Sequence, residues 1–535
     1  MKHQSGIVAA GHTATAEAGA AILRQGGNAV DAAIAAACTS FSTEPVLTSS
    51  GGGGFMLVAD SDNRNILFDG FARMPSGLAL IPELNTEMKA IPIDFGNTVQ
   101  TFHIGQASVG TPSLLAMLFA AHKQFGRLPL REALAPGIDA ARNGVRLNHL
   151  QASFIKLLSP ILTDTDTATD LYAPDRQGYT SGELLNEGET FSNPDLANTL
   201  EMLSIEGINE MYHGDLAKAI VTACIPRGLL SMDDMRAEQV HIRSPLQMPC
   251  MGGTLLTNPA PSSGGLLIAF AAALFDRLLE IDEAKQLSWP VLLAECLRSA
   301  SNKRHSGLDS RIYQANIADE ELTVGQLEKA VEVIRLRLSG LTDIPCAESG
   351  NRHGSTTHIS IMDQNGMAVS LTTSNGEGSG IVVPGTGIHL NNMLGEEDIN
   401  PLGFHALDPG TTLSSMMAPS ILLADGRPSM VLGSGGSNRL RGAILQTLVR
   451  HKLLGQDIET AVHAPRLHNE GNELEIEPDF ISEHERIQFM KLGWELKDWQ
   501  QQSVYFGGVH AISMDKKGNI QAGADPRRGG AVAWA

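Results

Sequence analysis

Alternating apolar and polar positions mark one stretch of the chain as a β-hairpin. Within residues 354–375, two arms with apolar side chains at every second position flank the sequence Asp-Gln-Asn-Gly at 363–366. Asn-Gly between two such arms is a strong hairpin signal, because both residues tolerate positive φ. The pattern therefore predicts two antiparallel strands joined by a tight turn.

The predicted hairpin gathers polar side chains around Thr356. A two-residue loop places Thr357 opposite Ser374 and Thr356 opposite Asn375, whereas a four-residue turn places Thr356 opposite Thr373. Opposed residues in an antiparallel pair lie about 4.5 to 5.5 Å apart at Cβ. In either register, hydroxyl and amide groups come close enough to hydrogen-bond a hydroxyl or an amine at the start of the strand.

A period of about 3.6 residues in the apolar positions predicts helices in the first part of the chain. Thr13 is a candidate N-cap for the first helix, and Asn28 or Asp31 begins the second. The expected helical segments are 14–24, 28–41, 111–124, 130–142, 195–205, 214–224 and 263–282. Residues from about 110 to 345 are therefore expected to be mostly helical.

Short apolar runs predict strands on both sides of this helical region. They are 56–59, 65–68, 381–383, 388–390, 420–423, 430–432, 473–477, 504–512 and 520–522. A further helix is expected to follow the glycine-rich turn at 433–439. The polar segment 346–355 has no periodicity and is the best linker in the chain. Strand-rich ends around a helical middle indicate a layered α+β fold.

Composition and charge narrow the class of protein. The chain has 535 residues and a net charge of -20, which argues against nucleic acid or an anionic membrane as a partner. No apolar run of about 18 residues and no signal peptide are found, so no membrane span is expected. The five cysteines form no paired motif, which suits free thiols in a reducing compartment and predicts a cytoplasmic protein.

Thr356 is the candidate nucleophile. It follows Gly354-Ser355 at the end of the linker and at the head of a strand. A self-cleaving precursor places there the residue that becomes a new N-terminus, whose α-amine has an ordinary pKa of about 7.7 to 8.0 and can take the hydroxyl proton. The alternative interpretation is a Thr-rich strand without chemistry.

Three further segments have both a chemical and a structural interpretation. The glycine-rich turn 433–437 offers backbone N–H groups to an oxyanion, or is only a tight connection before a helix. The acids at 396–398 bind an ammonium group, or form a solvated turn. The serines at 414–415 donate to a carboxylate, or cap a turn. His353 and His358 are interpreted as structural, and no metal-binding motif occurs.

Taken together, several motifs resemble the gamma-glutamyltranspeptidases, which are N-terminal nucleophile hydrolases. The matching segments occur in the same order over nearly the whole chain. They are Gly26-Gly27-Asn28-Ala29-Val30-Asp31-Ala32-Ala33, Gly52-Gly53-Gly54-Phe55, Pro261-Ser262-Ser263-Gly264-Gly265, Thr356-Thr357-His358 with Ser360, Asn391-Asn392, Leu413-Ser414-Ser415-Met416, Gly435-Gly436-Ser437 and Ala464-Pro465-Arg466.

The resemblance implies a four-layer αββα sandwich and a precursor that cuts itself between Ser355 and Thr356. The expected products are a large subunit of residues 1–355, which contains the helical region of about 110–345, and a small subunit of residues 356–535. Both would form one interleaved fold, as a heterodimer and possibly as a higher oligomer. Neither a metal nor an organic cofactor is implied.

The resemblance also implies the catalytic roles. Thr356 attacks a γ-glutamyl carbonyl and forms an acyl-enzyme, and water or an amino acid then accepts the acyl group. Gly435 and Gly436 supply the oxyanion donors, although an ungapped alignment equally allows Gly436 and Ser437. Ser374 supports the nucleophile.

Substrate-binding roles follow from the same resemblance. Ser414 and Ser415 match the pair at the substrate carboxylate, Glu396 matches the acid at the substrate amine, and Asn375 joins the predicted binding site beside Ser374. The preceding Gln/Glu position of the family is occupied here by Met393.

The carboxylate-binding arginine of the family has no direct counterpart. Aligning Pro75 puts Phe71 and Ala72 where Arg and Glu are expected, and Arg73, two positions on, is the candidate replacement. The segment 399–412 is shorter than the lid loop of many relatives, which predicts an open pocket.

The sequence therefore predicts a γ-glutamyl hydrolase or transferase acting on small molecules such as glutathione. One alternative is an amidohydrolase on the same scaffold with another acyl group, such as a small oxo-acid amide or an acylated β-lactam. The other alternative is an unprocessed and inactive homologue.

Overall fold

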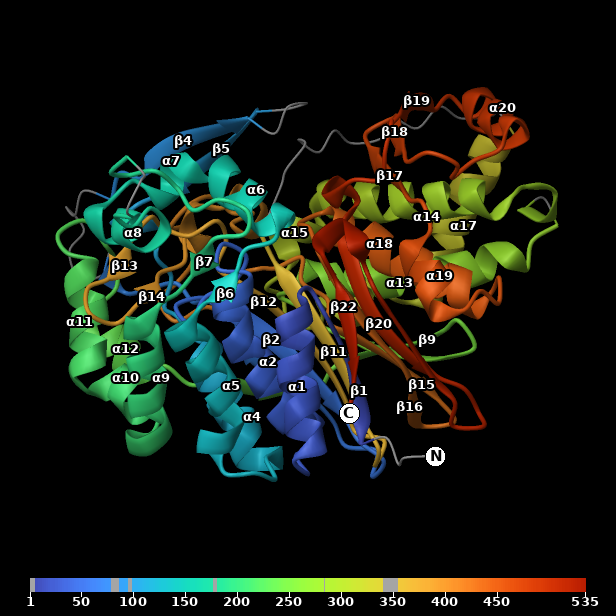
Figure 1. The fold of residues 1–535 in the computed structure, drawn as a ribbon. Coiled ribbons are helices and arrows are strands. Elements are labelled where there is room, and N and C mark those ends of the chain that lie inside the picture. The colour runs from blue at the N-terminus through green and yellow to red at the C-terminus, as the bar shows by residue number, and fades with distance from the viewer. Residues whose placement is uncertain (1–4, 78–85, 95–98, 177–179, 283, 340–354) are drawn as a thin grey trace.

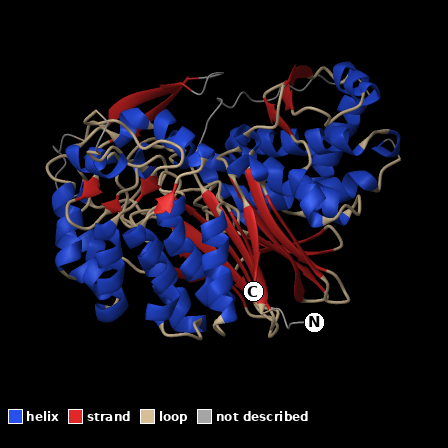
Figure 2. Ribbon diagram, viewed as in Figure 1, coloured by secondary structure: helices blue, strands red, loops and turns tan. Residues whose placement is uncertain are grey.

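The computed structural model describes residues 5–77, 86–94, 99–176, 180–282, 284–339 and 355–535. Two antiparallel β-sheets lie face to face at its centre, and helices cover the outer face of each sheet (Figure 1, Figure 2). The predicted α+β class and the four-layer αββα sandwich are therefore confirmed. Of the predicted linker at 346–355, only Ser355 lies within the described residues.

The first sheet has seven strands and contains the predicted hairpin at its centre. In spatial order these strands are β22 (Ala531–Trp534), β1 (Gly6–Ala10), β11 (Thr357–Asp363), β12 (Ala368–Ser374), β2 (Gly53–Ala59), β3 (Asn65–Gly70) and β8 (His241–Arg243). All neighbours are antiparallel. Because both faces of this sheet are covered, β11 and β12 are buried along their whole length.

The second sheet has six strands, also antiparallel. Their spatial order is β21 (Ile520–Ala524), β20 (Gly508–Met514), β16 (Arg427–Gly435), β15 (Ser420–Ala424), β10 (Gly253–Thr257) and β9 (Leu246–Cys250). Apolar side chains from both inner faces form the core between the sheets. The hydroxyl of Ser370 on β12 donates across this core to the carbonyl of Leu432 on β16, over 3.0 Å.

Helices cover the outer faces through apolar, alanine-rich surfaces. The helices over the first sheet include α1 (Thr13–Arg24), α2 (Ala29–Thr43), α4 (Leu114–Phe125), α5 (Leu130–Asn143) and α9 (Pro194–Glu206). Those over the second sheet include α13 (Ser263–Leu279), α14 (Trp289–Lys303), α17 (Val324–Leu338), α18 (Arg439–Lys452) and α19 (Ile458–His463). Asn28 and Asp31 form a capping box at the start of α2, which fixes where this helix begins.

The remaining elements lie around the sandwich. The smaller helices are α6 (His149–Leu157), α7 (Ser159–Leu162), α8 (Asp166–Tyr172), α10 (Asn209–His213), α11 (Asp215–Ala223), α12 (Met232–Ala237), α15 (Asp309–Arg311), α16 (Ile317–Glu321) and α20 (Glu483–Lys491). Three small sheets have two strands each: β4 (Lys89–Asp94) with β5 (Val99–Ile104), β6 (Val145–Arg146) with β7 (Thr190–Phe191), and β13 (Val382–Val383) with β14 (Ile388–His389). A fourth has three strands, β17 (Leu467–Glu470), β18 (Glu473–Ile476) and β19 (Glu495–Asp498). Among the described residues, no helix is long and apolar enough to span a membrane.

The hairpin is present, but both predicted registers are wrong. Thr357 lies opposite Thr373, one position away from each prediction. The backbone N–H of Asp363 donates to the carbonyl of Met367, which closes a loop of three residues that ends at Gly366 with φ of 83°. The Asp363 carboxylate accepts hydrogen bonds from the backbone N–H groups of Asn365 and Met367 inside this loop. This contact stabilises the three-residue loop and thereby sets the register.

The region 110–345 is mostly helical, as predicted, but it also supplies strands to both sheets. Strand β8 closes one edge of the first sheet, and β9 and β10 close one edge of the second. The predicted strand 504–512 divides into a 3₁₀ turn, η6 (Val504–Phe506), and strand β20. The predicted free thiols Cys38, Cys224, Cys250 and Cys296 are buried and unpaired, while Cys346 lies outside the described residues.

Candidate active site

Thr356 immediately precedes β11 and is 6% exposed. Arg528 donates from Nη1 to the Thr356 carbonyl over 3.0 Å. On the neighbouring sheet, Gly435 lies directly against this carbonyl, since a Cβ at position 435 would come within 2.2 Å of the Thr356 oxygen. The candidate nucleophile is therefore held between the two sheets by its backbone.

The carbonyl of Ser355 belongs to the peptide bond that is predicted to be cut, and a hydrogen bond holds it as well. The Ser374 hydroxyl donates to the Ser355 carbonyl oxygen over 2.6 Å. That hydroxyl accepts a hydrogen bond from the Gly376 N–H over 3.0 Å, which fixes its orientation. The pair is buried, because Ser355 and Ser374 are 8% and 7% exposed. A donor is thus directed at the carbonyl oxygen where negative charge develops when the 355–356 bond is attacked.

Glu377 holds the other side of Ser355, and the sequence analysis assigned it no role. Its Oε1 accepts a hydrogen bond from the Ser355 N–H over 3.1 Å. Burial and the nearby carboxylate of Glu396 raise the pKa of Glu377 well above its ordinary value. Gly376 and Gly378 precede and follow Glu377, and both have positive φ. Glycine at both neighbouring positions is the sequence feature that indicates an unusual backbone conformation around Glu377.

A small pocket of about 40 Å³ opens at the nucleophile, and we call it the Thr356 pocket. Besides Ser355 and Leu440, it is lined by Phe71, Thr356, Ser374, Met393, Glu396, Asp398, Ile399, Ser415, Met416, Met417 and Ser437. Five predicted site residues therefore meet here: Ser355, Thr356, Ser374, Glu396 and Ser415. The charged groups in this lining are all acidic, and the rest of the wall is largely apolar.

Glu396 is the predicted partner of a substrate amine. Its carboxylate oxygen Oε1 is shielded from solvent and has no hydrogen-bond donor among the described residues. Burial and the Asp398 carboxylate raise the pKa of Glu396 to about 8. Asp398 itself accepts from the hydroxyl of Ser437 over 3.1 Å and lies 3.7 Å from an Arg304 nitrogen. A bound ammonium group would satisfy the shielded Glu396 oxygen.

Other predicted residues lie close by with different partners. The Ser414 hydroxyl donates to the Pro261 carbonyl over 2.9 Å. Asn375 accepts from the Ser49 hydroxyl over 2.8 Å and donates to the Leu390 carbonyl. Neither residue lines the Thr356 pocket. Gly436, with φ of 121°, lies at the turn between β16 and α18.

Arg73 is not among the residues that line the Thr356 pocket. Its guanidinium forms an ion pair with Glu238 over 3.4 Å and donates to the Gln239 carbonyl. The lining residue from this segment is Phe71, the side chain that stands where the resemblance expects arginine. Among the described residues that line the Thr356 pocket, none is lysine or arginine.

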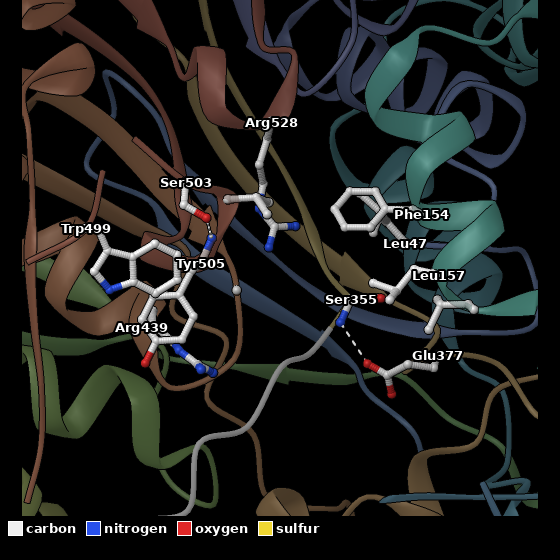
Figure 3. Close-up of a pocket in the computed structure, with 13 residues that line it drawn as sticks. Leu47, Phe154, Leu157, Ser355, Glu377, Arg439, Trp499, Ser503, Tyr505 and Arg528 are labelled. Atoms are coloured by element: carbon white, nitrogen blue, oxygen red, sulfur yellow. Dashed lines mark hydrogen bonds between the residues drawn. The ribbon is translucent and has the colours of Figure 1, made fainter. Parts of the chain in front are cut away.

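A larger pocket of about 210 Å³ lies on the other side of Ser355, and we call it the Tyr505 pocket (Figure 3). Tyr505, Trp499 and Arg439 lie together on one side, and Leu47, Phe154 and Leu157 lie on the other. The Arg528 guanidinium points into the space between them. Glu377 and Gly436 also contribute to its wall. No motif in the sequence points to the aromatic and cationic residues of this pocket.

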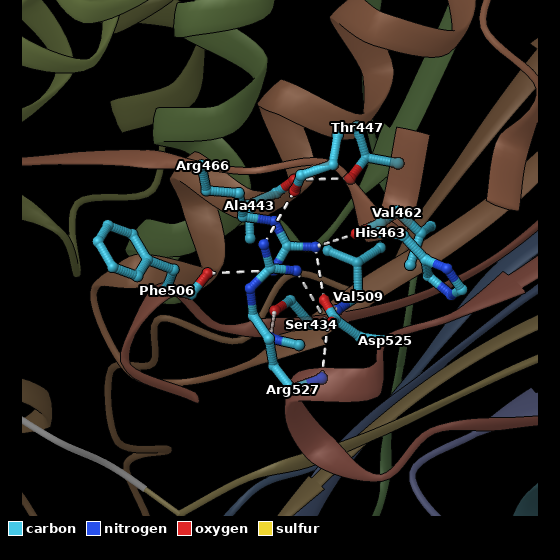
Figure 4. Close-up of polar contacts among 12 residues, drawn as sticks. Ser434, Ala443, Thr447, Val462, His463, Arg466, Phe506, Val509, Asp525 and Arg527 are labelled. Carbon is cyan, nitrogen blue, oxygen red and sulfur yellow. Dashed lines mark hydrogen bonds and ion pairs between the residues drawn. The ribbon is translucent and has the colours of Figure 1, made fainter. Parts of the chain in front are cut away.

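A buried ionic network joins Arg466, Asp525 and Arg527 beside the turn that ends with Arg528, and Figure 4 shows these three residues. Asp525 accepts from Arg466 Nη2 over 2.5 Å and from the Val509 N–H over 3.0 Å. Its other oxygen accepts from the backbone and side chain of Arg527, over 3.0 and 3.1 Å. These contacts fix the 3₁₀ turn η7 (Pro526–Arg528), and Arg528 at its end reaches Thr356.

His358 is a core residue, as predicted. Its ring bonds to the Thr372 hydroxyl over 2.8 Å and to the Ser360 hydroxyl over 3.0 Å. Burial lowers the pKa of His358 well below its ordinary value, so the ring is neutral. His353 lies outside the described residues. His358 therefore does not serve as a base for Thr356, because both of its ring nitrogens are hydrogen-bonded within the core.

Comparisons with known proteins agree with this geometry. A sequence model described as gamma-glutamyltranspeptidase matches residues 15–535. The chain is 28% identical to the glutathione hydrolase proenzyme of Bacillus subtilis (strain 168), over 99% of this chain and 91% of the relative. It is also 28% identical to the acylase ACY 1 proenzyme of Pseudomonas sp. (strain SE83), over 97% and 91%. The crystal structure of cephalosporin acylase from Bacillus halodurans has the same fold, with a TM-score of 0.78 at 23% identity over 99% and 96% of the two chains. This chain belongs to the gamma-glutamyltranspeptidase family.

Proposed function

We propose that the protein is a self-processing γ-glutamyl hydrolase or transferase that cleaves γ-glutamyl amides such as glutathione. One observation carries the proposal: Thr356, at the head of β11, shares a pocket with Ser374, Ser415 and the shielded carboxylate of Glu396. Family membership and the relatives named glutathione hydrolase proenzyme support the same acyl group. A γ-glutamyl group carries an α-ammonium, which matches the acidic side of this pocket.

The first step is the cut between Ser355 and Thr356. The Thr356 hydroxyl attacks the Ser355 carbonyl carbon, and the amide bond is replaced by an ester while the freed nitrogen takes up a proton. Ser374 stabilises the developing oxyanion through its 2.6 Å hydrogen bond. Water then hydrolyses the ester, which leaves a carboxylate on Ser355 and an α-amine on Thr356.

The same hydroxyl then serves in turnover. The α-amine of Thr356 takes the hydroxyl proton as the oxygen attacks the substrate amide, and the proton passes to the departing amine. Gly435 and Gly436, or Gly436 and Ser437, stabilise the oxyanion through their N–H groups. Water or an amino acid then attacks the acyl-enzyme, releasing the acid or a new amide and regenerating Thr356.

The products of the cut are proposed to stay together as a heterodimer of residues 1–355 and 356–535. In the first sheet, β11 and β12 lie between β1 and β2, which belong to the other segment. Separating the two chains would therefore break the ladder on both sides of the hairpin. A denaturing gel shows two bands and size-exclusion chromatography shows one particle if this is right.

We propose a reducing compartment, the cytoplasm, because the four described cysteines are buried free thiols. Fractionation of cells that make the protein, with a thiol-alkylation assay on each fraction, tests this location.

Turnover of γ-glutamyl-4-nitroanilide by the processed protein tests the proposed function. Release of 4-nitroaniline at a rate that falls to background in Thr356→Ala is expected. If fully cut protein releases no nitroaniline while it hydrolyses another amide, the γ-glutamyl assignment is wrong and the nucleophile assignment stands.

A second candidate function is an amidohydrolase with another acyl group. The observation that favours it is the position of Phe71 in the pocket wall while Arg73 is paired with Glu238. Arginine–carboxylate pairs are strong, so a pocket without one recognises the α-carboxylate of a γ-glutamyl group less well. Relatives named acylase agree with this alternative. A panel of acyl-4-nitroanilides with and without the α-carboxylate separates the two.

A further inference from the structure

The Tyr505 pocket meets the Thr356 pocket at the bond to be cut. Ser355 lines both. On the Tyr505 side, Arg528 and Gly436 connect the pocket to the nucleophile, since Arg528 donates to the Thr356 carbonyl over 3.0 Å. A substrate whose acyl group occupies the Thr356 pocket therefore directs its leaving amine toward the Tyr505 pocket.

The walls of the Tyr505 pocket suit a flat ring. Trp499 stacks on Tyr505 with ring centroids 4.8 Å apart and an angle of 24° between the ring planes. Across the pocket lie Leu47, Phe154 and Leu157 (Figure 3). Its volume of about 210 Å³ exceeds the roughly 150 Å³ of an apolar cavity that admits benzene. A planar group can lie between these aromatic and aliphatic surfaces.

Two cationic side chains also line the pocket. The Arg439 guanidinium lies 4.2 Å from the centre of the Tyr505 ring, and the Arg528 guanidinium points into the pocket. Burial lowers the pKa of Arg528 only to about 10, so it is charged at neutral pH. These guanidinium groups contrast with the carboxyl groups of Glu396 and Asp398 in the lining of the Thr356 pocket.

Two hydrogen-bond donors in this lining have no protein acceptor. Trp499 Nε1 and Arg528 Nε are shielded from solvent and unpaired within the part of the chain that the structure describes. Buried polar groups normally have partners, so the unpaired Nε of Arg528, whose guanidinium points into the pocket, calls for an acceptor on a ligand.

We infer that the Tyr505 pocket binds the leaving group of the substrate, and that this group is a planar, ring-containing amine bearing a carboxylate. The inference rests on the proposed acyl transfer at Thr356 and names the class of amide it acts on. It assigns the donor specificity to two pockets of different chemistry: one lined by carboxyl groups for the acyl group, and a cationic, aromatic one for the amine.

The test compares two leaving amines that differ in one carboxylate, 5-amino-2-nitrobenzoate and 4-nitroaniline. Binding of each to the processed enzyme is measured by isothermal titration calorimetry, which needs no turnover. The carboxylated amine is expected to bind roughly tenfold or more tightly, because a hydrogen bond to a charged group contributes about that much. The same factor is expected in kcat/KM for γ-glutamyl-3-carboxy-4-nitroanilide over γ-glutamyl-4-nitroanilide.

Arg439→Gln is expected to remove most of this difference. Arg450→Gln is the matched control, because Arg450 also lies over an aromatic ring, 4.8 Å from the centre of Trp289, but outside the Tyr505 pocket. Trp499→Leu, in a partly exposed loop, provides a second variant. It is expected to weaken binding of both aromatic amines while leaving the preference for the carboxylate.

The outcomes separate this inference from the proposed function. Equal binding of the two amines, unchanged by Arg439→Gln and Trp499→Leu, overturns the pocket assignment even where both anilides are hydrolysed. Binding that prefers the carboxylate and depends on Arg439, in protein that hydrolyses neither anilide, supports the pocket and contradicts the γ-glutamyl acyl group.

Discussion

The Ser374 hydroxyl donates a 2.6 Å hydrogen bond to the carbonyl oxygen of Ser355. The two residues are separated by the whole hairpin, yet the register of β11 and β12 brings them together. Since the Gly376 N–H fixes the hydroxyl from behind, the donor is in place before any reaction starts. In the intact chain, a hydrogen-bond donor therefore already points at the carbonyl oxygen of the 355–356 peptide bond.

Ser374→Ala should slow self-cleavage by on the order of a hundredfold, the typical effect of losing one oxyanion donor. A time course on denaturing gels, started from freshly purified precursor, measures the rate. Ser374→Thr keeps the hydroxyl and should restore cutting. Thr373→Ala is the matched control, because the Thr373 hydroxyl bonds to Thr48 and not to Ser355. Equal rates for Ser374→Ala and Thr373→Ala would show that the hydrogen bond has no catalytic part.

Thr356→Ala should give a single full-length chain and no turnover, because the attacking hydroxyl is missing. Thr356→Ser retains the hydroxyl and should cut at an altered rate. Intact-protein mass spectrometry identifies the cut, and an amide-release assay on the same samples measures turnover. Release of substrate amine by protein whose 355–356 bond is intact would mean that another residue is the nucleophile.

Gly435→Ala should block processing and lower the melting temperature. Its Cβ would come within 2.2 Å of the Thr356 carbonyl oxygen, so the strands must separate or the carbonyl must leave Arg528. Overpacking of this kind costs about 1 to 3 kcal/mol. The control is Gly442→Ala in the neighbouring helix α18, where the nearest atom lies at an ordinary 3.5 Å. Differential scanning calorimetry and the gel assay together should show that only the first variant fails.

Local patterns in the sequence were enough to predict the hairpin and to single out Thr356 as the candidate nucleophile, but not to predict the contacts made across the fold. The loop length depends on the Asp363 carboxylate, which closes three residues instead of the two that Asn-Gly favours. Strands β9 and β10 were not predicted, because their burial depends on elements that come later in the chain. Strand β10 pairs with β15, and helix α13 packs on the same core.

The same contrast holds for the candidate site, where motifs indicate some residues and contacts across the fold decide the others. Ser374, Glu396 and Ser415 were placed by motif and do line the Thr356 pocket. Arg528 arrives from 172 positions beyond Thr356, on a turn fixed by a network that no local pattern reveals. The direction of Arg73 depends on Glu238, which belongs to a different segment of the chain. Side-chain direction of this kind is decided by the tertiary partner rather than by position in a motif.

The raised pKa of Glu396 predicts how stability depends on pH. In the folded protein this carboxyl keeps its proton up to about pH 8, whereas in the unfolded chain it releases the proton near its ordinary value of 4.5. Between these values the unfolded state binds fewer protons than the folded state, so raising the pH lowers the free energy of unfolding. Glu396→Gln has no proton to release, so its melting temperature should fall less between pH 5 and about 8.

Melting curves at several pH values measure this difference. Glu397→Gln is the control, because it removes a carboxylate from the adjacent, exposed position and should leave the slope as in the wild type. An amine that binds in the Thr356 pocket should reverse the trend, since the ammonium favours the ionised carboxylate and its stabilising effect grows with pH until the amine itself loses its proton. A parallel shift of the Glu396→Gln and wild-type curves, with equal slopes, would mean that the Glu396 carboxyl titrates as it does in water and is not the buried acid of this pocket.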